Sequence, residues 1–141
     1  MKIVMVASES NPLIKTGGLA DVAYSLSKEL VVMGHEVSII MPLYKRVRDK
    51  FASVIKKIDS FDVPMAWRVN AADIYVTYQN GIAFYLVDNA YYFGRDGVYG
   101  YGDDMERFGF FTMAAEVFIS RQKVMPISCT YMTGTQACLL A

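Results

Sequence analysis

Residues 15–22, Lys15-Thr16-Gly17-Gly18-Leu19-Ala20-Asp21-Val22, combine a cation, two adjacent glycines and the start of a helical apolar pattern. A helix that begins here would direct unpaired backbone N–H groups toward the preceding loop, which makes a ready anion site. Lys15 adds a full positive charge, and Gly17 and Gly18 let the backbone adopt positive φ and approach a ligand closely. Such a loop suits a diphosphate, because preorganised donors stabilise the charge that develops when it departs as a leaving group.

The same loop also has a purely structural interpretation. A glycine pair before a helix is common in α/β proteins, and residues 15–22 match neither the GxGxxG pattern nor the Walker pattern. The spacing alone therefore leaves a phosphate-binding role and a structural role open.

The elements around this loop predict a βαβ unit. Residues 2–7 form a short apolar run typical of a buried parallel strand, and residues 36–41 form the next one. Between them, apolar residues recur at helical spacing from Leu19 onward, and Gly34 is expected to end that helix. The loop therefore lies at the carboxyl edge of a sheet, where open α/β folds bind ligands. The apolar positions expected on one stripe of the helix are 19, 22, 23, 26, 30 and 33.

The rest of the pattern predicts an antiparallel excursion from the parallel sheet. Residues 45–57 are strongly basic and indicate a solvated short helix and its exit. Asn80-Gly81 is a strong hairpin signal between two strand-like segments, the second of which should rejoin the main sheet. A loop rich in aromatics and glycine follows at residues 88–103, and a helix is expected from Asp103 to about Arg121. The strand-like segments are 61–69, 73–79 and 82–87.

Composition narrows the class of protein. The 141 residues are 54% hydrophobic and 20% charged, which favours one globular domain. Fourteen Lys and Arg balance fourteen Asp and Glu, whereas a protein that mainly binds nucleic acid usually has a basic excess, so we expect no nucleic-acid partner. No run approaches eighteen apolar residues, so we expect no membrane span. The first apolar run is too short for a secretion signal, which favours a cytoplasmic location.

Few side chains suit metal or nucleophilic chemistry. His35 is the single histidine, so an HExxH zinc site is excluded, and its position before a strand predicts a surface turn. Cys129 and Cys138 lack CxxC spacing and support neither a metal site nor a disulfide framework. We therefore expect no metal cofactor.

Residues 1–125 resemble the N-terminal part of bacterial glycogen synthases and plant starch synthases. The most specific match is the KTGGLADV run at residues 15–22. The other matching pieces, besides the opening strand, are Glu9, Pro12, Gly34-His35-Glu36-Val37, Pro42-Leu43-Tyr44, Tyr99-Gly100 and residues 103–111.

The resemblance implies a retaining glucosyltransferase that moves glucose from ADP-glucose to the non-reducing end of an α-1,4-glucan such as glycogen, without a metal. It also implies the GT-B fold, in which two Rossmann-like domains face each other across a cleft. This chain would supply an incomplete N-terminal domain with an inserted antiparallel β-hairpin region. The family's C-terminal domain holds most of the nucleotide, so we assign no catalytic residue here and expect the chain alone to be inactive.

The resemblance also implies roles for individual residues. The family's lysine contacts the phosphates of the sugar nucleotide, so Lys15 inherits that role. Gly17 and Gly18 line the same site, and Asp21 faces the cleft near the glucan acceptor. These four are the substrate-binding residues that we expect at the first loop, the one between the strand at residues 2–7 and the helix that follows it.

Aromatic side chains of the loop at residues 88–103, the second loop, are candidates for sugar contact. Tyr99, with Tyr92 and Phe93, could offer sugar rings an apolar face, but aromatics in a glycine-rich loop also serve as anchors for that loop. Trp67 is expected to serve packing. Glu106 and Arg107 are expected to form a helix-surface network that is worth little if exposed.

Residues 126–141 depart from the resemblance. The family continues with PDIxHxHDWxTG, whereas this chain reads PISCTYMTGTQACLLA from Pro126. With one base restored in the Pro126 codon, the same DNA can encode PDIMHIHDWHTGMLA. The codon of Met132 ends in G and that of Thr133 begins with AC, so the restored frame must read GAC, aspartate, at that point. We therefore expect a domain of residues 1–125 followed by a frameshifted tail of residues 126–141.

Two other classes of protein remain as alternatives. A Rossmann-like nucleotide-binding domain such as a dehydrogenase would carry GxGxxG after the first strand and an acidic residue after the second, where Met41-Pro42 stands instead. A non-catalytic glucan-binding module would use Tyr92, Tyr99 and Trp67.

Overall fold

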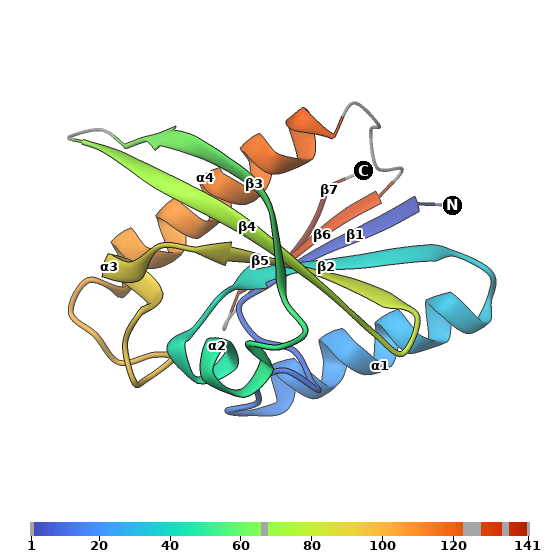
Figure 1. Cartoon of the computed structure of the whole chain (residues 1–141). Coiled ribbons are helices and arrows are strands. Elements are labelled where there is room, and N and C mark those ends of the chain that lie inside the picture. The colour runs from blue at the N-terminus through green and yellow to red at the C-terminus, as the bar shows by residue number, and fades with distance from the viewer. Residues whose placement is uncertain (1, 66–67, 123–127, 134–135, 141) are drawn as a thin grey trace.

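The computed structural model describes residues 2–65, 68–122, 128–133 and 136–140, with side chains for residues 2–65 and 68–122. Within these ranges, one mixed sheet of seven strands has the order β3-β4-β5-β2-β1-β6-β7 (Figure 1). The elements in chain order are β1 (Lys2–Ala7), α1 (Gly18–Val32), β2 (Glu36–Pro42), α2 (Lys45–Phe51), β3 (Lys56–Pro64), β4 (Val69–Gln79), β5 (Ile82–Asp88), α3 (Ala90–Phe93), α4 (Asp104–Arg121), β6 (Ser128–Thr133) and β7 (Gln136–Leu140).

The centre of the sheet is parallel. Strand β1 pairs with β2 on one side and with β6 on the other, and β2 pairs in turn with β5. The predicted βαβ unit is therefore confirmed, with α1 as its crossover. Figure 1 shows α1 and α4 on opposite sides of the sheet, as expected for right-handed crossovers that run in opposite directions along it. As a result, the loops that follow β1 and β5 leave the same sheet edge toward different faces.

The predicted antiparallel excursion is also present. Strands β4 and β5 form a hairpin whose turn residues, Asn80 and Gly81, have φ of 53° and 80°. These positive φ values are those of a type I′ turn, which explains the Asn-Gly pair. Strand β5 then rejoins the parallel sheet beside β2, as expected. The boundaries of β3 were predicted wrongly, because it begins at Lys56, inside the basic segment. Charged side chains are typical of an edge strand, where they stay solvated and hide the apolar alternation.

Helix α1 ends as expected but turns a different face to the sheet. Gly34 has φ of 93°, and the N–H of His35 donates to the Leu30 carbonyl at 3.1 Å, which closes a Schellman-type cap. The buried residues of the helix are the small ones, Ala20, Ala23 and Ser27. The expected apolar stripe is therefore wrong in part: the side chains that it placed on the sheet but that lie exposed are Val22, Leu26 and Met33. Small side chains let the helix lie close to the strands, and the Ser27 hydroxyl is satisfied by the Ala23 carbonyl at 2.7 Å.

Helix α4 covers the opposite face with large aromatic side chains, and its observed bounds agree with the prediction. Phe110, Phe111 and Phe118 are buried against the sheet. The centroids of the Phe118 and Tyr85 rings lie 5.0 Å apart. Among the helices that the structure describes, none is long and apolar enough to cross a membrane.

Strands β6 and β7 belong to the segment expected to be frameshifted. Their backbone extends the sheet beyond β1, with β6 parallel to β1 and β7 antiparallel to β6. The side chains of Cys129 and Cys138 lie outside the described residues, as does the whole of Trp67.

Candidate functional site

The loop after β1 folds back on itself before α1 begins. The N–H groups of Leu13 and Ile14 both donate to the Ser10 carbonyl, at 3.1 and 3.0 Å, and the side chains of Leu13 and Ile14 are buried. The peptide bond between Asn11 and Pro12 is cis. The two hydrogen bonds to Ser10 turn the chain, so that residues 15–17 lie next to the N-terminus of α1.

A buried carboxylate fixes the segment next to Lys15. Glu9 is 3% exposed, and its Oε2 accepts hydrogen bonds from the backbone N–H of Thr16 at 2.7 Å and from the Thr16 hydroxyl at 2.6 Å. Hydrogen bonds to an ionised acceptor are stronger than neutral ones, so this pair of contacts holds the loop firmly. Glu9 thus fixes Thr16, the residue that directly follows Lys15 in the chain.

Two of the predicted site residues contact each other directly. The Lys15 Nζ lies 2.6 Å from Asp21 Oδ2, across the junction between the loop and the first turn of α1. The Asn11 amide donates to the other oxygen, Asp21 Oδ1, at 2.5 Å. The side chains of Lys15 and Asp21 are 51% and 47% exposed. An ion pair this exposed is worth about 0–1 kcal/mol, so an anionic ligand can take over Lys15 at little cost.

The two glycines lie at open space. Helix α1 begins at Gly18, and its N-cap, Gly17, provides no side-chain cap for the first N–H groups. A Cβ added at Gly17 or Gly18 would meet nothing within 4 Å among the described residues. The predicted positive φ is wrong: Gly17 has φ of −164°, an extended conformation that any residue adopts, and Gly18 is helical. The two glycines thus leave the helix N-terminus open and need no unusual backbone conformation.

Tyr99 joins the two loops at this edge of the sheet. Its hydroxyl lies 2.7 Å from the Ser8 hydroxyl. The residue is 38% exposed, and the centroid of its ring lies 5.6 Å from that of Phe108. On the other side of Ser8, the buried Tyr44 hydroxyl donates to the Ser8 carbonyl at 2.6 Å. Burial raises the pKa of Tyr99 and raises that of Tyr44 well above its usual value, so both hydroxyls remain protonated at neutral pH.

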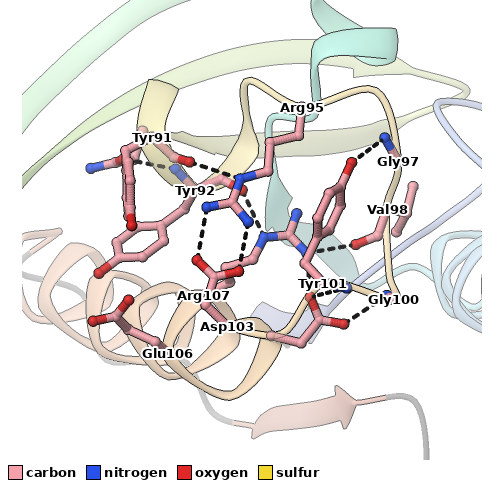
Figure 2. A network of polar contacts seen from close by, with 12 residues as sticks. Tyr91, Tyr92, Arg95, Gly97, Val98, Gly100, Tyr101, Asp103, Glu106 and Arg107 are labelled. Atoms are coloured by element: carbon pink, nitrogen blue, oxygen red, sulfur yellow. Dashed lines mark hydrogen bonds and ion pairs between the residues drawn. The ribbon is translucent and has the colours of Figure 1, made fainter.

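The rest of the second loop is held by arginines that alternate with aromatic rings (Figure 2). Arg95 forms two hydrogen bonds with the carboxylate of Asp103, at 2.6 and 2.8 Å. The Tyr101 ring lies next to two guanidinium groups, 5.0 Å from that of Arg95 and 4.8 Å from that of Arg107. These contacts tie Arg95 to the end of the loop and to the first turn of α4.

Arg107 lies at the centre of this arrangement and is fully buried. Its Nε donates to the Tyr92 carbonyl at 2.7 Å, and its Nη1 donates to the Val98 carbonyl at 3.0 Å and to Asp104 Oδ1 at 2.7 Å. The expectation that Arg107 lies in a helix-surface network is therefore wrong. Such burial is tolerated because the charge is paired and hydrogen-bonded and because ring faces surround it.

Tyr92 and Phe93 are buried anchors of the loop and not sugar-contacting surfaces. Both side chains are fully buried, and their rings pack against Phe110 at 5.0 and 6.3 Å. Of the three aromatics considered for sugar contact, only Tyr99 presents part of its ring to solvent.

The family model that describes a starch synthase catalytic domain matches residues 2–130 of the chain. The chain belongs to this family.

Two comparisons with individual starch synthase relatives agree. The chain is 48% identical over 126 residues to a glycogen synthase of Streptococcus pneumoniae strain 70585, and 47% identical to that of strain Hungary19A-6. The catalytic domain of starch synthase IV from Arabidopsis thaliana, solved with ADP and acarbose, superimposes with a TM-score of 0.78 at 28% identity. The matches cover 88–89% of this chain but 26% of each relative, so the chain spans about a quarter of their length. The structural likeness confirms the predicted fold class, a Rossmann-like α/β domain of the GT-B type with an antiparallel insertion.

Sequence reasoning placed the starch synthase loop correctly but missed what holds it. Glu9 was noted as part of the motif, without its role as acceptor for Thr16, and the contact between Lys15 and Asp21 was not foreseen. A carboxylate directly after a buried strand, where solvent is scarce, was the available signal for Glu9. Among the described residues, no group of three or more His, Cys, Asp or Glu side chains is arranged to hold a metal ion.

Proposed function

We propose that this chain supplies the N-terminal part of a glucosyltransferase site that moves glucose from ADP-glucose to the non-reducing end of an α-1,4-glucan with retention. The observation that carries the proposal is the placement of Lys15 beside the uncapped N-terminus of α1, with open space at Gly17 and Gly18. Family membership supports a nucleotide-sugar donor. Since the chain spans about a quarter of its relatives, we propose that it is inactive alone.

The chemistry follows from the charge that develops on the leaving group. When the bond between glucose C1 and the β-phosphate oxygen breaks, the departing ADP gains negative charge. Lys15 and the first N–H groups of α1 are positioned to stabilise that charge, because the positive end of a helix attracts anions. Before the donor binds, Asp21 neutralises the charge of Lys15 and keeps that side chain near the N-terminus of α1. We propose that this cation and the helix terminus serve without a metal.

Acceptor binding is proposed for the neighbouring surface. Asp21, once released from Lys15, offers a hydrogen-bond acceptor toward the cleft for sugar hydroxyl groups. Tyr99 offers part of a ring face at the other side of the loop, and a flat apolar surface with a polar rim suits a sugar ring. A non-catalytic glucan-binding module is less well supported, since Tyr92 is fully buried.

A chimeric enzyme tests the proposal. Residues 1–125 replace the matching segment of the Streptococcus pneumoniae glycogen synthase, and transfer of labelled glucose from ADP-glucose to glycogen is measured. We expect the chimera to be active and Lys15→Ala to lower kcat about a hundredfold or more, the scale of losing a preorganised donor. Lys28→Ala removes an exposed lysine of the same helix, which lies over Tyr24, and should change kcat less than twofold. Equal activities of the two variants would contradict the proposal.

We also propose that residues 126–141 arise from a frameshift at Pro126. The support is the codon agreement between the tail and the family's PDIxHxHDWxTG segment. Sequencing the encoding DNA across and beyond Pro126 should reveal the synthase sequence continuing in the neighbouring frame. A downstream sequence with no synthase-like frame would contradict the frameshift and leave the proposed site untouched.

A further inference from the structure

A groove beside the first loop carries positive charge that the proposed transfer reaction does not require. It lies between residues 11–15 and helix α2, and three cations line it: Lys15, Arg46 and Lys50. No carboxylate is among its lining residues in the described part of the chain. Cations gathered around one hollow repel one another and attract an anion, so the groove favours a negatively charged ligand.

Helix α2 separates its cations into two sets. Lys45 pairs with Asp96 at 3.1 Å, and Arg48 pairs with Asp88. Arg46 and Lys50, one helical turn apart, form no ion pair within the described residues, and the Lys50 Nζ lies over the Phe51 ring at 5.6 Å. These two unpaired cations line the groove together with Lys15, which pairs with Asp21 at 2.6 Å. The helical part of the basic segment is thus more than a solvated face, because both unpaired cations of α2 line one groove.

We propose that this groove binds the phosphate group of a phosphate monoester. The planar guanidinium of Arg46 can donate two parallel hydrogen bonds to a phosphate, and the two lysines add compact charges around it. Two sources share this chemistry: a free sugar phosphate, and a phosphate group carried by a glucan chain. The inference goes beyond the proposed function, since it assigns a second anionic ligand with Arg46 and Lys50 as its own contacts. Lys15 lines the groove as well, so its occupant would draw on the cation proposed for the donor.

Amide chemical-shift titrations of the 141-residue chain test this inference. Inorganic phosphate and glucose 6-phosphate should give saturable shifts at residues 11–15 and 45–51, and unphosphorylated glucose should give none. The double variant Arg46→Gln/Lys50→Gln should weaken both phosphates at least tenfold. The matched control, Lys45→Gln, lies on the same helix but pairs with Asp96 and should leave the affinity within twofold.

Further measurements distinguish the two sources of phosphate. They also distinguish the proposal for the groove from the proposal for the donor site. A short α-1,4-glucan with a phosphate monoester that binds tenfold more tightly than glucose 6-phosphate would assign the polymer-borne group, and equal binding would assign the free ester. Absence of saturable shifts with every phosphate compound would overturn the inference, as would equal weakening by the double variant and by Lys45→Gln. In the chimeric synthase, the KM for ADP-glucose should rise with Lys15→Ala and stay unchanged in Arg46→Gln/Lys50→Gln. The proposal for the donor site can therefore hold if the proposal for the groove is wrong. The proposal for the groove can likewise hold if that for the donor site is wrong.

Discussion

The loops after β1 and β5 lie at the same edge of the sheet and meet at Ser8 and Tyr99, yet they hold their charges in opposite ways. In the first loop, Lys15 and Asp21 are about half exposed and contact each other at the surface. The second loop is held by Arg107 of helix α4, which is fully buried and hydrogen-bonded to two carbonyls and a carboxylate. A surface pair is released at little cost, whereas a buried charge is expensive to disturb.

This contrast indicates a division of labour. The first loop is fixed by buried groups, Glu9 and Tyr44, and carries its cation in an exposed pair with Asp21. In the second loop, charged side chains contact other groups of the loop, and Tyr99 is held by its contacts with Ser8 and Phe108. Substitutions should therefore separate into those that unfold the edge of the sheet and those that affect ligands alone.

Replacing the buried arginine should have the largest effect on stability. Arg107→Met removes the donors of the Tyr92 and Val98 carbonyls and leaves the Asp104 carboxylate without its cation. A buried carbonyl left without its donor costs about 1–3 kcal/mol, so we expect a loss of about 3–5 kcal/mol from the two carbonyls and the weakened carboxylate together. Urea unfolding followed by circular dichroism measures the loss. Arg121→Met is the matched control, because that arginine lies exposed on the same helix and pairs with Asp59. Similar losses in both variants would refute a special role for the buried charge.

Replacing the buried carboxylate of the first loop should have the next largest effect. Glu9→Gln removes the charge that accepts two hydrogen bonds from Thr16 and leaves one amide oxygen in its place. Hydrogen bonds to charged groups contribute about 1.5–3 kcal/mol, so we expect a loss of unfolding free energy in that range. Faster hydrogen exchange at the Thr16 amide would localise the effect. The control is Glu36→Gln, whose exposed carboxylate lies 3.9 Å from Lys2 and should matter little. An unchanged Thr16 exchange rate would contradict the positioning role of Glu9.

The Tyr44 hydroxyl should have a smaller effect that depends on pH. Tyr44→Phe removes its hydrogen bond to the Ser8 carbonyl, worth about 1 kcal/mol at neutral pH. Burial raises the folded-state pKa of Tyr44 well above 10.0, so above about pH 10 the unfolded chain loses this proton first. The stability of the parent chain should then fall as pH rises beyond 10, and fall less steeply in Tyr44→Phe. Unfolding measured at pH 8 and pH 11 tests the difference, with Tyr78→Phe as the exposed control. Parallel pH profiles of the parent chain and Tyr44→Phe would rule out this titration.

How far the sequence predicts this molecule depends on whether the signal is local. The Asn80-Gly81 turn, the Gly34 cap and the βαβ unit follow from local backbone preferences and apolar periodicity, and the structure confirms them. The buried face of α1 did not follow, because the helix packs through Ala20, Ala23 and Ser27 while longer apolar side chains face solvent. Hydrophobic periodicity favours large residues and gives little weight to the small ones that let a helix approach a sheet.

The candidate site shows the same limit. The residue types at positions 15–18 suggested an anion site, but the partners that fix it come from tertiary contacts. Glu9 reaches Thr16, and Asp21 reaches Lys15, only after the loop folds back. Arg107 was misplaced for a related reason, since no local rule indicates that α3, the loop after it and the start of α4 close around one guanidinium group.

The smallest effect on stability should come from the residues proposed to matter most for the ligand. Lys15→Ala and Asp21→Asn each break an exposed ion pair, so the unfolding free energy should change by no more than about 1 kcal/mol and the change should shrink in high salt. In the chimeric synthase, the same Lys15→Ala should still lower kcat strongly. A stability loss as large as that of Glu9→Gln would mean that Lys15 holds the loop together. Its effect on turnover would then report a collapsed loop, and the contrast between the buried Arg107 and the exposed pair of Lys15 would fail.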